Sequence, residues 1–164
     1  MKFKSIVAAI DAGDDLATAV ILAADSLARH DGAALHVVSA WPTLPTFAPG
    51  FPGEFGADAA RYSKELRDAD NEARKKQEAA LGSLARARNP LATVAVIVGD
   101  PGDVAPDYAE KVGADLIVAG SHQRGFWDAL FSGASSREVV RNAPCGVFLV
   151  TKPFAEKLLA QDGC

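Results

Sequence analysis

Cysteine is scarce in this sequence, which excludes a fold stapled by disulfides or built around zinc. The 164 residues include two cysteines, Cys145 and Cys164, without metal-ligand spacing or a framework of pairs, and we interpret both as ordinary thiols. Phosphate-binding loops of the Walker type or of the form Ser-Gly-Gly-x-Asp-Ser are also absent. An enzyme that adenylates substrates or hydrolyses ATP is therefore a minor alternative, since the sequence shows no catalytic base.

Excess positive charge and long apolar runs are missing as well. Lys and Arg total 17 against 21 Asp and Glu, a formal net charge of -4, so we expect no nucleic-acid partner. The apolar run that follows the basic residues at the N-terminus ends at Asp11, Asp14 and Asp15. It is too short for an export signal or for the roughly 20 residues of a membrane span. We expect a cytoplasmic protein without a membrane partner.

What the sequence does contain is enough apolar residues for one compact domain, at 49% of the chain. Short, continuous apolar runs bounded by polar residues are typical of strands that are buried on both faces of a parallel sheet. Five such runs lie at 5–10, 34–38, 92–98, 115–119 and 146–150. The sequence therefore predicts five strands.

Helical patterns separate these strands. They cover 14–30, 57–88, 101–112 and 135–142, with Asp14 or Asp15 placed to cap the first, while four prolines mark 41–52 as a loop. Alternating strands and helices predict right-handed crossovers and a doubly wound α/β sheet. Because ligands bind such sheets beyond the carboxyl ends of the strands, where the strand order reverses, Asp11 and Gly120 indicate the candidate site.

Two segments at this edge could bind a nucleotide. The segment 120–136 leads from a strand into a helix start, where unpaired N–H groups, glycines and the hydroxyls of Ser135 and Ser136 suit a phosphate. A cap and turn explain the same residues equally well. Asp11 could accept hydrogen bonds from a ribose hydroxyl or an adenine amino group, or it could serve as a turn residue.

The histidines and aromatic residues near this edge are assigned structural roles. His36 lies inside an apolar strand and is interpreted as a hydrogen-bonded core histidine. His122 follows the fourth strand and could reach a ligand or hold the loop, but no nucleophile and acid complete a triad around it. Phe126 and Trp127 are expected to cover the core or a cleft.

Several blocks of this sequence resemble the universal stress protein family, over roughly residues 4–152. The blocks are Ile6 to Asp11, Leu35 to Val38, Gly99-Asp100-Pro101, Gly113 to His122, and Gly133 through Arg141-Asn-Ala-Pro-Cys145 to Val150. The resemblance implies a five-stranded parallel sheet in the order 3-2-1-4-5, an adenine nucleotide alpha hydrolase-like, Rossmann-like fold. It also implies a family domain at 1–152, which leaves 153–164 as a C-terminal tail.

ATP-binding members of that family carry Gly-x-x-Gly, nine residues, and then Gly-Ser or Gly-Thr. Here Gly120 and Gly133 match, but Gln123 replaces the second glycine and Ala134 replaces the hydroxyl residue, so this chain resembles the branch with a degenerate ATP motif. By resemblance, the ligand is ATP, ADP or AMP, with magnesium only if ATP binds. The implied ligand contacts are Ala9, Ile10, Asp11, Val37, Gly120, Gly133, Ala134, Ser135 and Ser136.

The family resemblance further implies a homodimer through the fifth strand, 146–150, because an open apolar edge strand needs a partner. The partner protein in the stress response is not identified. Two functions stay open: a module whose cleft is closed by side chains such as Gln123, which we favour slightly, and a nucleotide-responsive regulator. A receiver-like signalling domain is a minor alternative, suggested by Lys152-Pro153 after the last strand and by Asp100 as a phosphoacceptor.

Overall fold

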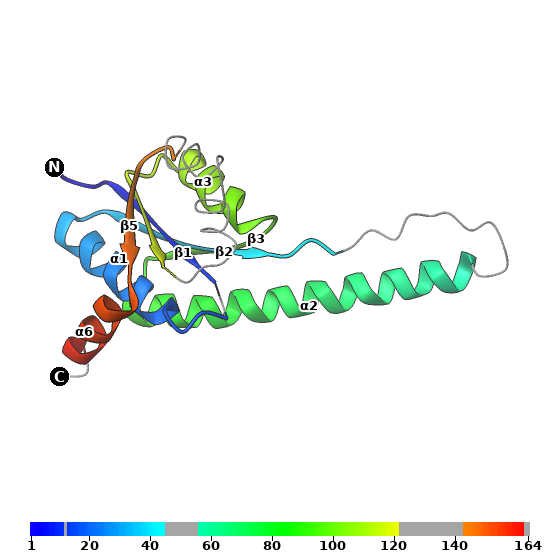
Figure 1. The fold of residues 1–164 in the computed structure, drawn as a ribbon. Helices are drawn as coiled ribbons and strands as arrows, with labels where there is room; N and C mark the ends of the chain where they lie inside the picture. Colours follow the sequence, from blue (N-terminus) through cyan, green and yellow to red (C-terminus); the bar gives the residue numbers. More distant parts are fainter. Residues whose placement is uncertain (12, 45–55, 122–142, 163–164) are drawn as a thin grey trace.

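The protein is a parallel α/β sheet with helices on both faces (Figure 1). The structure is a computed structural model that describes residues 1–11, 13–44, 56–121 and 143–162. The strands are β1 (Ser5–Ile10), β2 (Ala34–Trp41), β3 (Thr93–Val98), β4 (Leu116–Gly120) and β5 (Gly146–Val150). The helices are α1 (Ala17–Asp31), α2 (Gly56–Arg88), α3 (Pro101–Lys111) and α6 (Lys152–Asp162). The predicted helix at 135–142 lies outside the described residues.

The strand order is β3-β2-β1-β4-β5, and the strand pairs are parallel throughout. This confirms the order 3-2-1-4-5 expected from the sequence. A receiver domain has the order 2-1-3-4-5, in which the third strand lies next to the first, so the receiver alternative is wrong. Asp100, its candidate phosphoacceptor, instead caps α3, because its carboxylate accepts a hydrogen bond of 2.8 Å from the Gly102 N–H.

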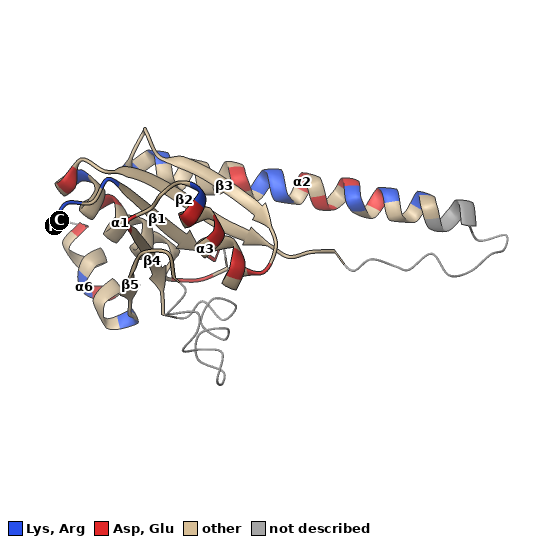
Figure 2. Cartoon of the chain, turned by 90° about the horizontal axis from the view of Figure 1, so that it is seen from above, with Lys and Arg blue, Asp and Glu red and all other residues tan. Residues whose placement is uncertain are grey.

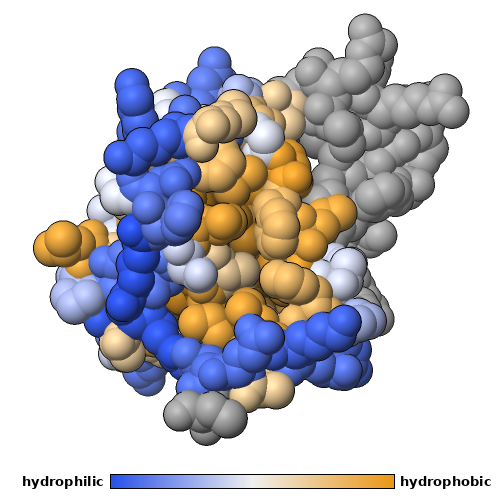
Figure 3. Space-filling model, turned by 90° about the vertical axis from the view of Figure 1, so that its left-hand side faces the viewer, coloured by the Kyte–Doolittle hydropathy of each residue, from blue (hydrophilic) through white to orange (hydrophobic). Residues whose placement is uncertain are grey.

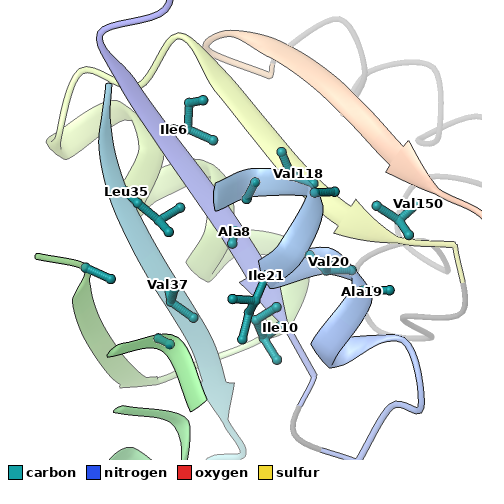
Figure 4. Close-up of a cluster of buried hydrophobic side chains, with 14 of the residues drawn as sticks. Ile6, Ala8, Ile10, Ala19, Val20, Ile21, Leu35, Val37, Val118 and Val150 are labelled. Atoms are coloured by element: carbon teal, nitrogen blue, oxygen red, sulfur yellow. The ribbon is translucent and has the colours of Figure 1, made fainter. Parts of the chain in front are cut away.

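The core lies on both faces of the central strands. All six residues of β1 and all five of β4 are buried, which explains why their sequences are continuous apolar runs rather than alternating ones. On one face, Ile6, Ala8 and Ile10 pack under α1, α2 and α6, as Figure 4 shows for the α1 contacts. On the other face, Val7 and Ala9 pack under α3.

Helix α1 begins without the cap that the sequence predicts. Its N-cap residue is Leu16, and no side chain caps the first turn. The Asp14 carboxylate accepts a hydrogen bond of 2.9 Å from the N–H of Leu16. Leu16 precedes the first residue of the helix, so this bond does not satisfy an N–H of the first helical turn. The predicted end at Gly32 is confirmed, since this glycine has a φ of 70° and its N–H donates to the Ala28 carbonyl.

Strand β2 is longer than predicted, and helix α2 extends far beyond it. Ala40 and Trp41 pair with Ile97 and Val98 of β3, so the strand passes the predicted end at residue 38 and the predicted loop begins at Pro42. Loop residues 45–55 lie outside the described part of the chain. The amino-terminal half of α2 projects from the body of the molecule and carries charges of both signs (Figure 2). No helix in the described residues is long and apolar enough to cross a bilayer.

Helix α6 was not predicted from the sequence. It begins two residues after β5 ends and contacts α1, with Ala155 almost fully buried and Leu158 against the core. Its last residue, Asp162, forms an ion pair with Arg88 at the end of α2. Most of residues 153–164 are therefore a docked helix.

Candidate functional site

The ends of β1 and β4 lie side by side at the carboxyl edge of the sheet. The two strands pair from Ile6 with Leu116 to Ala9 with Ala119, so Ile10 and Gly120 follow at the same level. Asp11 comes directly after β1, and its side chain is exposed. The topology thus brings Asp11 and Gly120 to one edge, at the point where the strand order reverses, as the sequence predicts.

The turn between β1 and α1 is built by aspartate side chains. The Asp11 carboxylate accepts a hydrogen bond of 3.0 Å from the Gly13 N–H, and the Asp11 carbonyl accepts one of 3.0 Å from the Asp14 N–H. The Asp14 carboxylate then accepts from Leu16. These local bonds hold the carboxylates at the edge of the sheet, because short Asp side chains bond readily to backbone N–H groups nearby.

Gly120 allows this turn to pack closely on the end of β4. A Cβ at residue 120 would lie 3.2 Å from Asp14 Oδ2 and 3.4 Å from the Leu16 Cβ. Such contacts are tighter than most real Cβ contacts, so any larger residue would push the turn away. The glycine therefore sets the distance between β4 and the first turn of α1.

Asp14 carries an unusual carboxylate in this arrangement. Its Oδ2 atom is buried and has no hydrogen-bond partner among the described residues. Burial raises the pKa of Asp14, the neighbouring carboxylates of Asp15 and Asp11 raise it further, and the hydrogen bond from Leu16 opposes the change. The folded protein therefore binds a proton at Asp14 more tightly than the unfolded chain does.

Asp14→Asn is expected to stabilise the protein at pH 7, because the folded state then no longer holds a partly buried carboxylate beside other acidic groups. Because the folded-state pKa is raised, the contribution of Asp14 to stability is full below the unfolded pKa of 3.8 and is lost as pH rises through the folded pKa. Urea unfolding at pH 7 and below pH 3.8 measures this. The gain should vanish at the lower pH, and Asp107→Asn, a change at an exposed aspartate of α3 that does not act on Asp14, should give little gain. A gain equal at both pH values contradicts the prediction.

The other predicted contact residues divide into three groups. Ala9 and Ile10 lie at the end of β1 beside Asp11 and are buried. Val37 pairs with Ala8 in the middle of β2 and is fully buried in the core, so the structure does not bring it to the edge. Ser39 of β2 pairs with Ile10 of β1, so the next residue of β2, Ala40, lies at the level of Asp11. Residues 133–136, with His122, Gln123, Phe126 and Trp127, lie outside the described residues.

His36 has the hydrogen-bond partner that the sequence predicts, but it is half-buried on the sheet face under α3 rather than in the core. The Tyr108 hydroxyl lies 3.4 Å from His36 Nδ1, and the two rings meet edge to face at 5.9 Å. Burial lowers the pKa of His36 and raises that of Tyr108. Cys145 is half-buried as well, and burial raises the pKa of its thiol. His36 and Cys145 do not lie at the carboxyl edge of the sheet, since His36 is in the middle of β2 and Cys145 precedes β5.

Two features of this edge were missed by sequence reasoning. One is the contact of Asp14 with Gly120. The available signal was the spacing of three residues between Asp11 and Asp14, which is typical of a turn. The other is a pair of hydrogen bonds that join β2 to α2: Trp41 Nε1 donates to Asp70 Oδ1 at 2.9 Å, and Gln77 Nε2 donates to the buried Ser39 hydroxyl at 3.2 Å.

The arrangement supplies hydrogen-bond acceptors at the carboxyl edge of the sheet. The described residues at this edge offer exposed carboxylates on Asp11 and Asp15 and no ion pair to either. Across the described ranges, no three His, Cys, Asp or Glu side chains converge in a way that could hold a metal ion. Acceptors of this kind suit the hydroxyl and amino groups of a nucleoside.

Comparisons with known proteins agree with this geometry. Residues 2–151 match the model of the universal stress protein family. A universal stress protein of Thermus aquaticus is 32% identical over 148 residues, which cover 90% of this chain and 98% of that protein. The Archaeoglobus fulgidus universal stress protein in complex with dAMP is similar in fold, with a TM-score of 0.57 and 24% identity over 91% of this chain and 98% of that one. A universal stress protein in complex with cAMP gives a TM-score of 0.55 and 20% identity over 92% and 98%.

Proposed function

This chain belongs to the universal stress protein family, and from that membership we propose that it is a homodimeric stress-response module whose crevice takes an adenine nucleotide with few phosphate charges. One observation carries the proposal. Asp11 and Gly120 meet at the carboxyl edge of β1 and β4, where this architecture binds its ligands. Asp11 would accept from a ribose or adenine group, and Gly120 would keep the turn that carries Asp11 packed against the end of β4.

The charge of the edge favours a monophosphate over ATP. Asp11 and Asp15 lie exposed on the turn that leads into α1, and their negative charges oppose the field of the helix N-terminus, which would otherwise attract phosphate groups. Gln123 and Ala134 replace a glycine and a hydroxyl residue of the ATP motif. Both differences weaken the binding of a triphosphate more than that of a monophosphate.

Relatives support the same class of ligand. The similar structures mentioned above were determined with dAMP and with cAMP, each of which carries one phosphate. The family resemblance implies that Ala9 and Ile10, which precede Asp11 at the end of β1, also contact the ligand. We propose Ala40, rather than the core residue Val37, as the contact from β2, since Ala40 follows Ser39 at the level of Asp11.

Isothermal titration calorimetry with AMP, ADP and ATP, each with and without magnesium, tests this function. We expect AMP to bind about tenfold tighter than magnesium-free ATP, since several negative charges meet across a short distance. Asp15→Asn should narrow the difference in affinity between AMP and ATP, and Asp107→Asn, an exposed change beyond the first turn of α3, should leave that difference unchanged. Tighter binding of ATP overturns the charge argument. If no nucleotide binds at millimolar concentration, the module acts without a nucleotide.

The dimer is proposed through β5. This strand is the last in the sheet and, within the described residues, pairs with β4 alone. Val147 and Leu149 are 39% and 38% exposed. An open edge presents unpaired N–H and C=O groups that a second strand can satisfy, and antiparallel pairing of two β5 strands about a twofold axis is the closed solution for identical chains. Light scattering at micromolar concentration should give the mass of two chains; the mass of one chain overturns the dimer.

A further inference from the structure

Helix α6 leaves an aromatic side chain exposed beside the centre of β5. Phe154, near the start of α6, meets Phe148 edge to face, with ring centroids 5.8 Å apart at 70°. Phe148 is half-buried against the core, yet Phe154 remains 40% exposed and Leu159 on the same helix 38% exposed. An aromatic ring of this size gains several times more from burial than a small residue does.

This exposed group is continuous with the open edge of the sheet. Figure 3 views the molecule from the side that carries β5, α6 and the N-terminus, and it shows apolar surface bordered by hydrophilic residues on the left and below. Phe148 and Val150 point to the face of the sheet that α1 and α6 cover, because both belong to the core cluster of that face. Phe154 contacts Phe148 on this face and is itself 40% exposed, so it adds to the apolar surface beside the edge strand.

Symmetry determines what can cover this surface. β5 has five residues, Gly146–Val150, so antiparallel pairing of two copies along the whole strand places Phe148 opposite Phe148 of the second copy. Residues directly opposite in an antiparallel pair lie on the same face of the sheet, with Cα atoms about 4.5 to 5.5 Å apart. The two Phe148 rings then lie together on the α6 face, with a Phe154 ring beside each.

We propose that α6 forms part of the homodimer interface, in which Phe148 and Phe154 of both copies make a cluster of four aromatic rings on the twofold axis. This inference rests on the β5 dimer proposed above. It gives α6 a function that docking on α1 does not explain: Ala155 and Leu158 hold the helix on its own chain, while Phe154 faces the second copy. Edge-to-face aromatic contacts add stability beyond the area they bury.

Phe154→Glu tests the contribution of α6. Light scattering should show at least a tenfold larger dimer dissociation constant, while circular dichroism shows an unchanged fold, because the side chain is exposed in a single chain. Leu91→Glu is the matched control, since Leu91 is a large apolar residue with 91% exposure away from β5, and it should remain a dimer. A Phe154→Glu protein that dimerises as tightly as wild type overturns the proposal, although the β5 dimer stands.

Phe148→Cys tests the twofold axis itself, in a background with Cys145→Ser and Cys164→Ser. Mild oxidation should join most chains by a disulfide, since a Cα separation of about 4.4 to 6.8 Å permits one. Leu149→Cys, exposed on the same strand, should not cross-link, because its own copy is displaced along the strand. A dimer without the Phe148→Cys cross-link overturns the proposed register. A monomeric wild-type protein overturns both this inference and the dimer of the proposed function.

Discussion

Gly120→Val is expected to weaken the binding of AMP about tenfold or more, which corresponds to about 1.4 kcal/mol. A Cβ at this position would already approach Asp14 Oδ2 and Leu16 at 3.2 to 3.5 Å. The two additional methyl groups must displace the turn that carries Asp11, or else fill the space beside the end of β4. Either change separates the groups that we propose to contact the nucleoside. Calorimetry with AMP measures the loss.

Gly146→Val is the matched control for this experiment. It adds the same side chain to a glycine at the end of a sheet strand, where a Cβ would lie 3.4 Å from the Leu116 side chain. Residue 146 begins β5, so it lies at the amino edge of the sheet, opposite the crevice. Its affinity for AMP should match that of the wild type. Equal weakening in the two variants would mean that distortion of the sheet, rather than the crevice, causes the loss.

Ile117→Ala is expected to lower the free energy of unfolding by about 2 to 5 kcal/mol. Ile117 is fully buried in the middle of β4, between Val7 of β1 and Val147 of β5, and packs in the cluster under α3. The substitution removes three carbons from a site whose neighbours on both strands are fixed by backbone pairing, so the cavity cannot close. Domains of this size are stable by about 5 to 15 kcal/mol in total.

Urea unfolding at one fixed protein concentration measures this loss, because the proposed dimer would make apparent stability depend on concentration. Leu91→Ala removes three carbons from an aliphatic side chain that is 91% exposed, and its effect should stay within about 0.5 kcal/mol. A loss below about 1 kcal/mol for Ile117→Ala would contradict the packing described for this face of the sheet.

The fold was largely predictable because its strands are short apolar runs between polar residues. The predicted bounds of β1 and β5 agree with the structure, and the alternation of elements led to the parallel sheet. The end of β2 was missed because Ser39 interrupts the apolar run and Pro42 follows closely. Helix α6 was missed because Pro153 and a short apolar pattern directly after a strand are weak signals for a helix.

The site was predictable to the level of strand ends but not to the level of register. Topology alone places Asp11 beside Gly120, and the structure confirms this neighbourhood. A strand buried on both faces has no polar and apolar alternation, so its sequence does not reveal its offset from the next strand. Val37 was implied by the family resemblance, and the structure places it in the core, whereas Ala40 follows Ser39, the residue that pairs with Ile10. The contact between Asp14 and Gly120 depends on a local turn that periodicity does not describe.

The amino-terminal part of α2 extends well beyond the point where the helix is bonded to β2, so a small tilt of the helix displaces its tip. Trp41 holds the helix at Asp70, and the residues from Gly56 to Asp70 extend about 21 Å further at 1.5 Å per residue. A tilt of about 5° at this hinge point would swing the tip by about 2 Å, by the geometry of a rigid rod. Trp41 lies on the strand next to β1, so a tilt of α2 relative to this strand would displace the tip of the helix more than it displaces Asp70.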